Sequence, residues 1–79
     1  MNKVKNLVIY TNKYFKDDEK ALFDVDTETV LLTGDYYHDK IDFKIEGYLL
    51  ALNINKDDVP TEEIDNSHKY FEKFNFMED

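Results

Sequence analysis

The sequence predicts a small α+β domain in which a three-stranded antiparallel sheet is followed by two helices, in the order β-β-β-α-α. Three observations support this expectation. The first part of the chain holds three short segments rich in β-branched and aromatic residues, a stretch with helical periodicity follows, and Pro60 marks the start of a second such stretch. The chain of 79 residues has no repeat and no linker, so we expect one domain over residues 1–79.

The three strands are predicted over residues 4–10 (VKNLVIY), 21–26 (ALFDVD) and 28–33 (ETVLLT). A tight turn near Asp26 and Thr27 joins the second strand to the third, which makes a meander the economical arrangement. Six apolar residues of these strands are expected to supply the core of the sheet: Leu22, Phe23, Val25, Val30, Leu31 and Leu32.

The first helix is predicted to begin at Asp35 and to run to about Asn53. Gly34 ends the sheet, and the Asp35 carboxylate suits an N-cap because it can accept the free amides of a first helical turn. At about 100° per residue, six side chains fall on one face, which we expect to pack on the sheet. They are Tyr37, Ile41, Ile45, Tyr48, Leu49 and Leu52.

The second helix is predicted over residues 61–75, after the break at Val59-Pro60-Thr61. Its buried stripe is formed by Ile64, Ser67, Phe71 and Phe74, with Tyr70 at the margin. Three of the aromatic residues in this part of the chain also fit the period of two that is typical of a strand: Tyr70, Phe74 and Phe76.

The first helix carries a second apolar stripe opposite its core face. Tyr36, Phe43 and Leu50 are spaced by seven, with Gly47 among them. Acids border the stripe on one side and lysines on the other: Asp39, Asp42 and Glu46 against Lys40 and Lys44. Either the second helix covers this stripe, or it is a surface for another protein or a second copy of the chain. Gly47 would let another backbone approach closely.

Charge is divided unevenly along the chain. The formal charge is −8, yet the first sixteen residues hold four lysines and no acid, and no arginine occurs anywhere. Such a chain is repelled by nucleic acid and anionic membranes and attracted to basic protein surfaces. Lys3 and Lys5 are expected to protect an edge strand and to offset acids across the sheet, and the alternative is that they contact a partner.

The acids form three groups that are candidate partner-binding residues. Asp24, Asp26 and Glu28 alternate, so that on a strand they would share one face at a spacing of about 6–7 Å. The other groups are Asp39, Asp42 and Glu46 on the flank of the first helix, and Asp57, Asp58, Glu62, Glu63 and Asp65 around the start of the second. The last group also has a structural explanation, because acids at the start of the second helix would interact favourably with its dipole. Rows of carboxylates can occupy a groove that binds nucleic acid, or they simply keep a small protein soluble.

Residues for catalysis or metal binding are sparse. Without cysteine there is no disulfide, thiolate site or thiol nucleophile. His38 and His68 lack a third imidazole for a zinc site. We therefore expect His38 to pair with one of its neighbouring acids, Asp35, Asp39 or Asp42, and His68 to be partly buried. A calcium loop beginning at Asp24 would need glycine and glutamate where Thr29 and Asp35 stand. We expect no enzyme activity, no cofactor and no metal.

In composition, the whole chain resembles the small acidic inhibitors that phages carry against bacterial defence systems. It is short, acidic, free of cysteine and rich in tyrosine and phenylalanine, and the run GDYYHDKID at residues 34–42 is similar to phage protein sequences. This class includes anti-CRISPR proteins and DNA-mimic inhibitors of restriction or repair enzymes. The resemblance implies a non-enzymatic inhibitor in the bacterial cytoplasm that blocks a basic, nucleic-acid-binding surface of a host protein without binding nucleic acid or membrane itself.

The alternative is a small homodimeric regulatory or scaffolding protein. In that case two copies would associate through the aromatic stripe of the first helix, formed by Tyr36, Phe43 and Leu50. Salt separates the two hypotheses, because charge-driven binding to a basic surface weakens with ionic strength whereas an apolar dimer does not.

Overall fold

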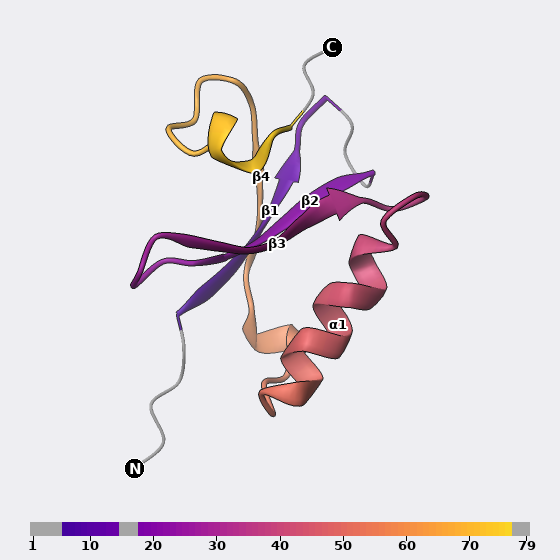
Figure 1. Cartoon of the computed structure of the whole chain (residues 1–79). Coiled ribbons are helices and arrows are strands. Elements are labelled where there is room, and N and C mark those ends of the chain that lie inside the picture. Colours follow the sequence, from indigo (N-terminus) through magenta and orange to yellow (C-terminus); the bar gives the residue numbers. More distant parts are fainter. Residues whose placement is uncertain (1–5, 15–17, 77–79) are drawn as a thin grey trace.

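Four strands form one mixed sheet in the order β3-β2-β1-β4 (Figure 1). The computed structural model describes residues 6–14 and 18–76. Along the chain the elements are β1 (Leu7–Asn12), β2 (Glu19–Asp24), β3 (Thr29–Asp35), α1 (Ile41–Ala51), the 3-10 turn η1 (Lys56–Asp58), β4 (Thr61–Ile64) and the 3-10 turn η2 (Glu72–Phe74). The α+β class is therefore confirmed, whereas the order of elements is only partly as predicted.

The predicted meander is confirmed, with small shifts in its boundaries. β1 pairs antiparallel with β2, and β2 pairs antiparallel with β3. The register shifts between Leu22 and Phe23, which pair with Leu32 and Val30. Because of this bulge Leu31 and Leu32 both pack toward α1, while Val30 packs on the other side. Val25, which we expected in the core, is exposed in the turn that follows β2.

The predicted helix over residues 61–75 is wrong, because its first residues form a fourth strand. β4 pairs in parallel with β1, with Thr61 opposite Ile9. The amide of Ile9 donates to the carbonyl of Pro60 at 2.9 Å, and that of Lys13 donates to the carbonyl of Ile64 at 2.8 Å. β1 is thus an inner strand, so it is not the edge that Lys3 and Lys5 were expected to protect. Both lysines lie outside the described residues.

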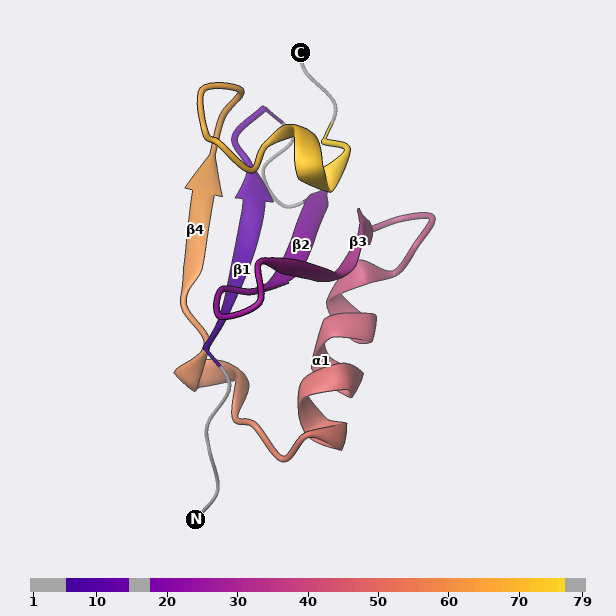
Figure 2. The same ribbon diagram turned by 60° about the vertical axis from the view of Figure 1, so that its left-hand side comes forward.

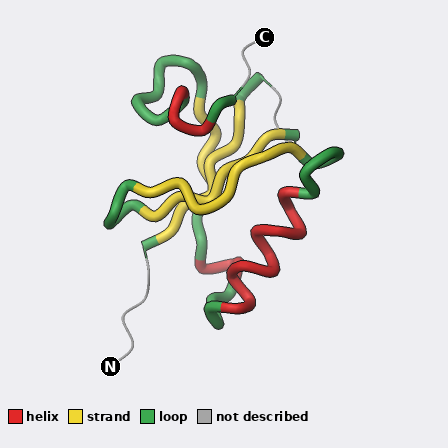
Figure 3. Tube along the Cα trace, viewed as in Figure 1, coloured by secondary structure: helices red, strands yellow, loops and turns green. Residues whose placement is uncertain are grey.

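After β4 the chain makes turns in place of a helix, and only η2 is helical there (Figure 3). The Asp65 carboxylate accepts the backbone amide of Ser67, which closes a local turn that competes with helix formation. Ile64, Phe71 and Phe74 are buried as predicted, but Ser67 is exposed.

The two faces of the sheet are covered by different parts of the chain, whereas we expected both helices on one face. Figure 1 shows α1 on one side of the sheet and the C-terminal segment on the other. The core toward α1 consists of Leu7, Ile9, Leu22, Ile41, Ile45, Leu49 and Val59. The core under the C-terminal segment is mainly aromatic and consists of Tyr10, Ala21, Phe23, Ile64, Phe71, Phe74 and Phe76. The sheet can be buried on both sides because its inner strands carry apolar side chains on both faces.

α1 is shorter than predicted and begins at Ile41. The residue before it, Lys40, has a left-handed backbone with φ 54° and provides the N-cap without a side-chain hydrogen bond. Asp35 ends β3, and its carboxylate accepts the amides of His38 at 2.6 Å and Asp39 at 3.0 Å. The carboxylate therefore holds the turn over residues 36–39 instead of capping the helix.

The core face of α1 is largely as predicted. Ile41, Ile45 and Leu49 are buried at a spacing of four, and Tyr48 is half-buried. Leu52, beyond the end of the helix, and Tyr37, in the turn before it, are exposed. The helix thus needs only three fully buried side chains to dock on the sheet.

Candidate protein-binding surface

The outer face of α1 carries two large apolar side chains that no described part of the chain covers. Phe43 is 66 % exposed and Leu50 is 78 % exposed. Gly47 lies between them, and a Cβ placed on it would meet nothing within 4 Å. The C-terminal segment, which we considered as a cover for this stripe, lies across the sheet from α1. We call Phe43, Gly47 and Leu50 the α1 outer face.

The heptad spacing predicted that Tyr36 continues this stripe along the helix, but it does not. It lies in the turn between β3 and α1, where its ring packs edge-on against Tyr37 with the centroids 5.1 Å apart. Most of the large apolar side chains that are exposed in the described residues belong to this turn and to α1 with its C-cap: Tyr36, Tyr37, Phe43, Leu50 and Leu52. Concentrated apolar exposure of this kind marks interaction sites.

Two of the three acids predicted on the helix flank hold the fold together. Asp42 forms an ion pair of 2.6 Å with Lys20 of β2, and both side chains are largely buried. The Asp39 carboxylate accepts the amide of Asp35 at 2.9 Å and packs against Gly34, where an added Cβ would lie 2.6 Å from Asp39 Oδ2. Asp39 and Glu46 are both exposed, and Glu46 is the one that lies on α1 beside the outer face.

Replacing Asp42 with alanine is expected to lower the free energy of unfolding by about 1–2 kcal/mol, because it leaves the largely buried Lys20 ammonium without its partner. Urea denaturation of the variant beside the parent chain measures this loss. Glu46→Ala is the matched control and should change stability by less than about 0.5 kcal/mol. Equal effects of the two substitutions would show that the Lys20 pair does not stabilise the helix on the sheet.

The row of carboxylates predicted from Asp24, Asp26 and Glu28 does not form. Asp24 is buried, and its Oδ1 accepts the amide of Asp26 at 3.0 Å, which closes the turn over residues 25–28. Glu28 has a positive φ of 53° and accepts a hydrogen bond of 3.0 Å from the Tyr70 hydroxyl. The turn near Asp26 and Thr27 is confirmed, and it is this turn that keeps the three acids off a common strand face.

The third group of acids surrounds a strand and not the start of a helix. Asp57 and Asp58 lie in η1, where the Asn55 side chain accepts the Asp57 amide at 3.0 Å. Glu62 and Glu63 lie in β4, and all four acids are exposed. The second helix, whose dipole was expected to favour these acids, does not form over residues 61–75, so that explanation of the cluster is wrong.

The two histidines are held by local contacts. His38 lies in the turn before α1, exposed, with Nδ1 3.1 Å from the carboxylate of Asp35, one of the neighbouring acids with which it was expected to pair. His68 is half-buried, as predicted, and its ring packs against those of Tyr10 and Tyr70 at centroid distances of 5.3 and 5.6 Å. Its Nδ1 accepts the amide of Tyr70 at 3.1 Å. Within the described ranges no three His, Asp or Glu side chains are grouped to hold a metal ion.

The hydrogen bonds that Asp35 accepts from the amides of Asp39 and His38 lower the pKa of its carboxyl below the ordinary 3.8. A depressed pKa means that this carboxylate contributes stability fully above the unfolded value and loses it as the pH falls through the folded value. In an NMR titration, we therefore expect the amide resonances of His38 and Asp39 to shift together with a midpoint below 3.8. The same amides should lack this transition in Asp35→Ala, and a midpoint at or above 3.8 would contradict the assignment.

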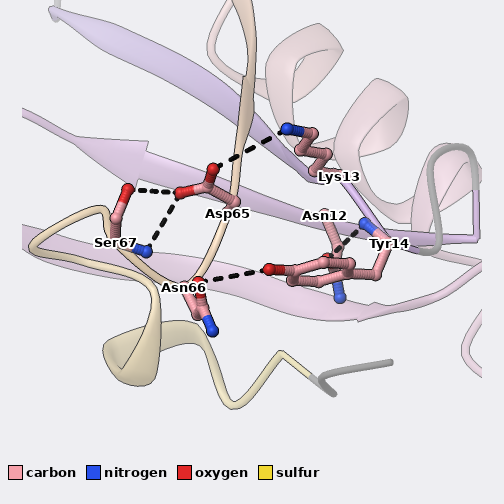
Figure 4. A network of polar contacts seen from close by, with 6 residues as sticks. All are labelled: Asn12, Lys13, Tyr14, Asp65, Asn66 and Ser67. Atoms are coloured by element: carbon pink, nitrogen blue, oxygen red, sulfur yellow. Dashed lines mark hydrogen bonds and ion pairs between the residues drawn. The ribbon is translucent and has the colours of Figure 1, made fainter.

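A polar network ties the end of β4 to the end of β1 (Figure 4). Asp65 accepts hydrogen bonds from the hydroxyl and amide of Ser67, which hold its pKa below the usual value, and it lies 3.9 Å from Lys13 Nζ. The Tyr14 hydroxyl donates to Asn66 at 3.1 Å. Beside this network lies an open hollow of about 610 Å³, lined by Lys13, Glu63, Ile64, Asp65, Ser67, His68 and Lys69. The network fixes where β4 ends.

Sequence reasoning did not identify β4 as a surface, and in the structure Thr61, Glu62 and Glu63 are all exposed while Ile64 is buried. Among the described residues, none of the helices is long and apolar enough to cross a membrane. Comparisons of the chain with protein families, with curated proteins and with solved structures found no match.

Proposed function

We propose that this chain is a non-enzymatic inhibitor that binds a host protein through the α1 outer face. The exposure of Phe43 and Leu50 carries the proposal, because a helix that packs on a sheet through one face has no structural use for large apolar side chains on the other. Aromatic and other large side chains are the anchors on which protein interfaces depend. The rings of Tyr36 and Tyr37, in the turn before the helix, are exposed as well.

The partner surface is an apolar groove with a basic rim. A net charge of −8 without any arginine favours approach to lysine- and arginine-rich surfaces, including those that bind nucleic acid. Glu46 supplies a carboxylate directly beside the anchors, while Asp24, Asp39 and Asp42 have structural contacts of their own. The proposal of basic-site blocking, in a bacterial cytoplasm as the compositional resemblance implies, thus rests on the overall charge and not on a row of carboxylates.

Affinity capture from a bacterial lysate with the immobilised chain, followed by mass spectrometry, tests this proposal. We expect a captured protein that elutes at high salt and that duplex DNA displaces in competition, since both observations require a basic nucleic-acid site. Retention of the partner in the presence of excess DNA would overturn the blocking of such a site.

A homodimer through the same face is the second candidate, and Gly47 favours it. Its open position would allow two α1 helices to approach closely. About a two-fold axis parallel to the helix, the Glu46 side of one copy would face the Lys44 side of the other. Analytical ultracentrifugation decides: a concentration-dependent dimer that Gly47→Leu dissociates supports this candidate, and a strict monomer at high concentration removes it.

A further inference from the structure

β4 lies at the edge of the sheet and is paired on one side only. Its partner is β1, and Figure 2 shows no described element beyond it. The carbonyls of Pro60 and Ile64 accept hydrogen bonds from β1. Because backbone groups alternate in direction along a strand, Thr61 and Glu63 point their amides and carbonyls away from the sheet. Both residues, and Glu62 between them, are exposed.

We propose that the free edge of β4 binds an extended, basic segment of a partner protein as an additional strand. The outward amides and carbonyls of Thr61 and Glu63 would supply main-chain hydrogen bonds, the source of affinity in strand addition. The proposal concerns a surface separate from the α1 outer face and does not rest on it.

Charge decides what kind of segment fits this edge. Glu62 stands opposite Tyr10 on the aromatic face, and its negative charge adds to burial in raising the pKa of the Tyr10 hydroxyl. Glu63 points to the opposite face by alternation along the strand. An added strand would therefore meet a carboxylate on each of its faces, at the cross-strand spacing of about 4.5–5.5 Å where opposite charges attract. Adjacent lysine or arginine residues within a β-prone segment match this pattern.

The same carboxylates exclude the most obvious competitor, which is a second copy of β4. Pairing two β4 edges would bring Glu62 and Glu63 of one copy close to those of the other, and like charges in cross-strand positions are destabilising. The exposed acids of η1, Asp57 and Asp58, precede the strand and extend the negative field. Short, charged edges of this kind avoid self-association, so the edge selects a basic strand.

The test uses a fluorescein-labelled peptide, TVKRVTV, titrated into the full chain and followed by fluorescence anisotropy. We expect binding that weakens at least about tenfold in Glu62→Lys/Glu63→Lys, because two attractive cross-strand pairs become repulsive. Asp57→Lys/Asp58→Lys is the matched control: it makes the same change in net charge in η1 and should weaken binding by no more than about threefold. Equal losses in the two variants would overturn strand addition in favour of unspecific attraction.

Two further peptides separate main-chain pairing from charge alone. In one peptide the amides of alternate residues are N-methylated, and in the other the amides of the remaining residues. Only one edge of the added strand faces β4, so one peptide should lose binding and the other should keep it. In amide hydrogen exchange of the parent chain, Thr61 and Glu63 should gain protection on addition of the unmodified peptide. Equal binding of both methylated peptides, or no gain in protection, would overturn the proposal.

The outcome is independent of the proposed function. Phe43→Asp, which alters the α1 outer face, should bind the peptide as the parent chain does, since Phe43 lies on a helix that packs against β2 and β3. Loss of peptide binding in that variant would place the peptide on α1 and would overturn the assignment to β4. Failure of lysate capture with intact peptide binding would overturn the proposed function alone.

Discussion

Replacing Phe74 with alanine is expected to lower the free energy of unfolding by about 3–5 kcal/mol. Phe74 is 1 % exposed at the centre of the aromatic core, with its ring centroid 5.2 Å from that of Tyr10 and 5.5 Å from that of Phe23. Its carbonyl also accepts a hydrogen bond of 3.0 Å from Thr33 of β3. Small domains are stable by only about 5–15 kcal/mol, so the loss is a large share of the total.

Phe43→Ala is the matched control, because it removes the same side chain from an exposed position. We expect it to change stability by less than about 0.5 kcal/mol. Urea denaturation followed by circular dichroism measures both variants on one scale. A large loss for Phe43→Ala with a small one for Phe74→Ala would mean that the C-terminal segment covers α1 and not the far face of the sheet.

Introducing aspartate at both Phe43 and Leu50 is expected to weaken binding of the captured partner at least about 100-fold, because truncation of interface anchors costs about 2 kcal/mol or more each. Both side chains face solvent in the unbound chain, so the variant should stay folded. Fluorescence anisotropy with the purified partner measures the affinity, and circular dichroism checks the fold.

The control for this variant adds the same charge elsewhere on the surface. Val25 and Thr27 are exposed in the turn between β2 and β3, and Val25→Asp/Thr27→Asp should leave partner affinity within about threefold. If the Phe43/Leu50 variant binds as tightly as this control, the α1 outer face is not the contact surface.

Local patterns in the sequence were sufficient to predict β1, β2, β3 and the core face of α1. Alternating or continuous apolar residues specify these strands, and Ile41, Ile45 and Leu49 repeat at a helical spacing, so each element could be recognised from its own residues. The start of α1 could not be recognised in this way, because the carboxylate of Asp35 can accept backbone amides either as the N-cap of a helix or within a turn. In the structure it holds a turn, since β3 extends through Gly34 to Asp35 by pairing with β2.

β4 could not be predicted from its own residues. The segment Thr61–Ile64 reads TEEI, and glutamate is not enriched in strands, so nothing local distinguishes it from the start of a helix. Its extended state depends on hydrogen bonds to β1, about fifty residues earlier in the chain. The positions of the candidate acids were unpredictable for a similar reason, since the turn that Asp24 closes sets Glu28 beside Tyr70.

By itself, the sequence determined the α+β class, the acidic field and the presence of two apolar stripes on one helix. Tertiary structure decided which stripe stays in contact with solvent. The aromatic side chains of the C-terminal segment were needed on the second face of the sheet, where Tyr10 and Phe23 offer a matching apolar surface. With that segment occupied there, Phe43 and Leu50 have no cover within the described chain, because a single segment cannot bury two distant surfaces at once.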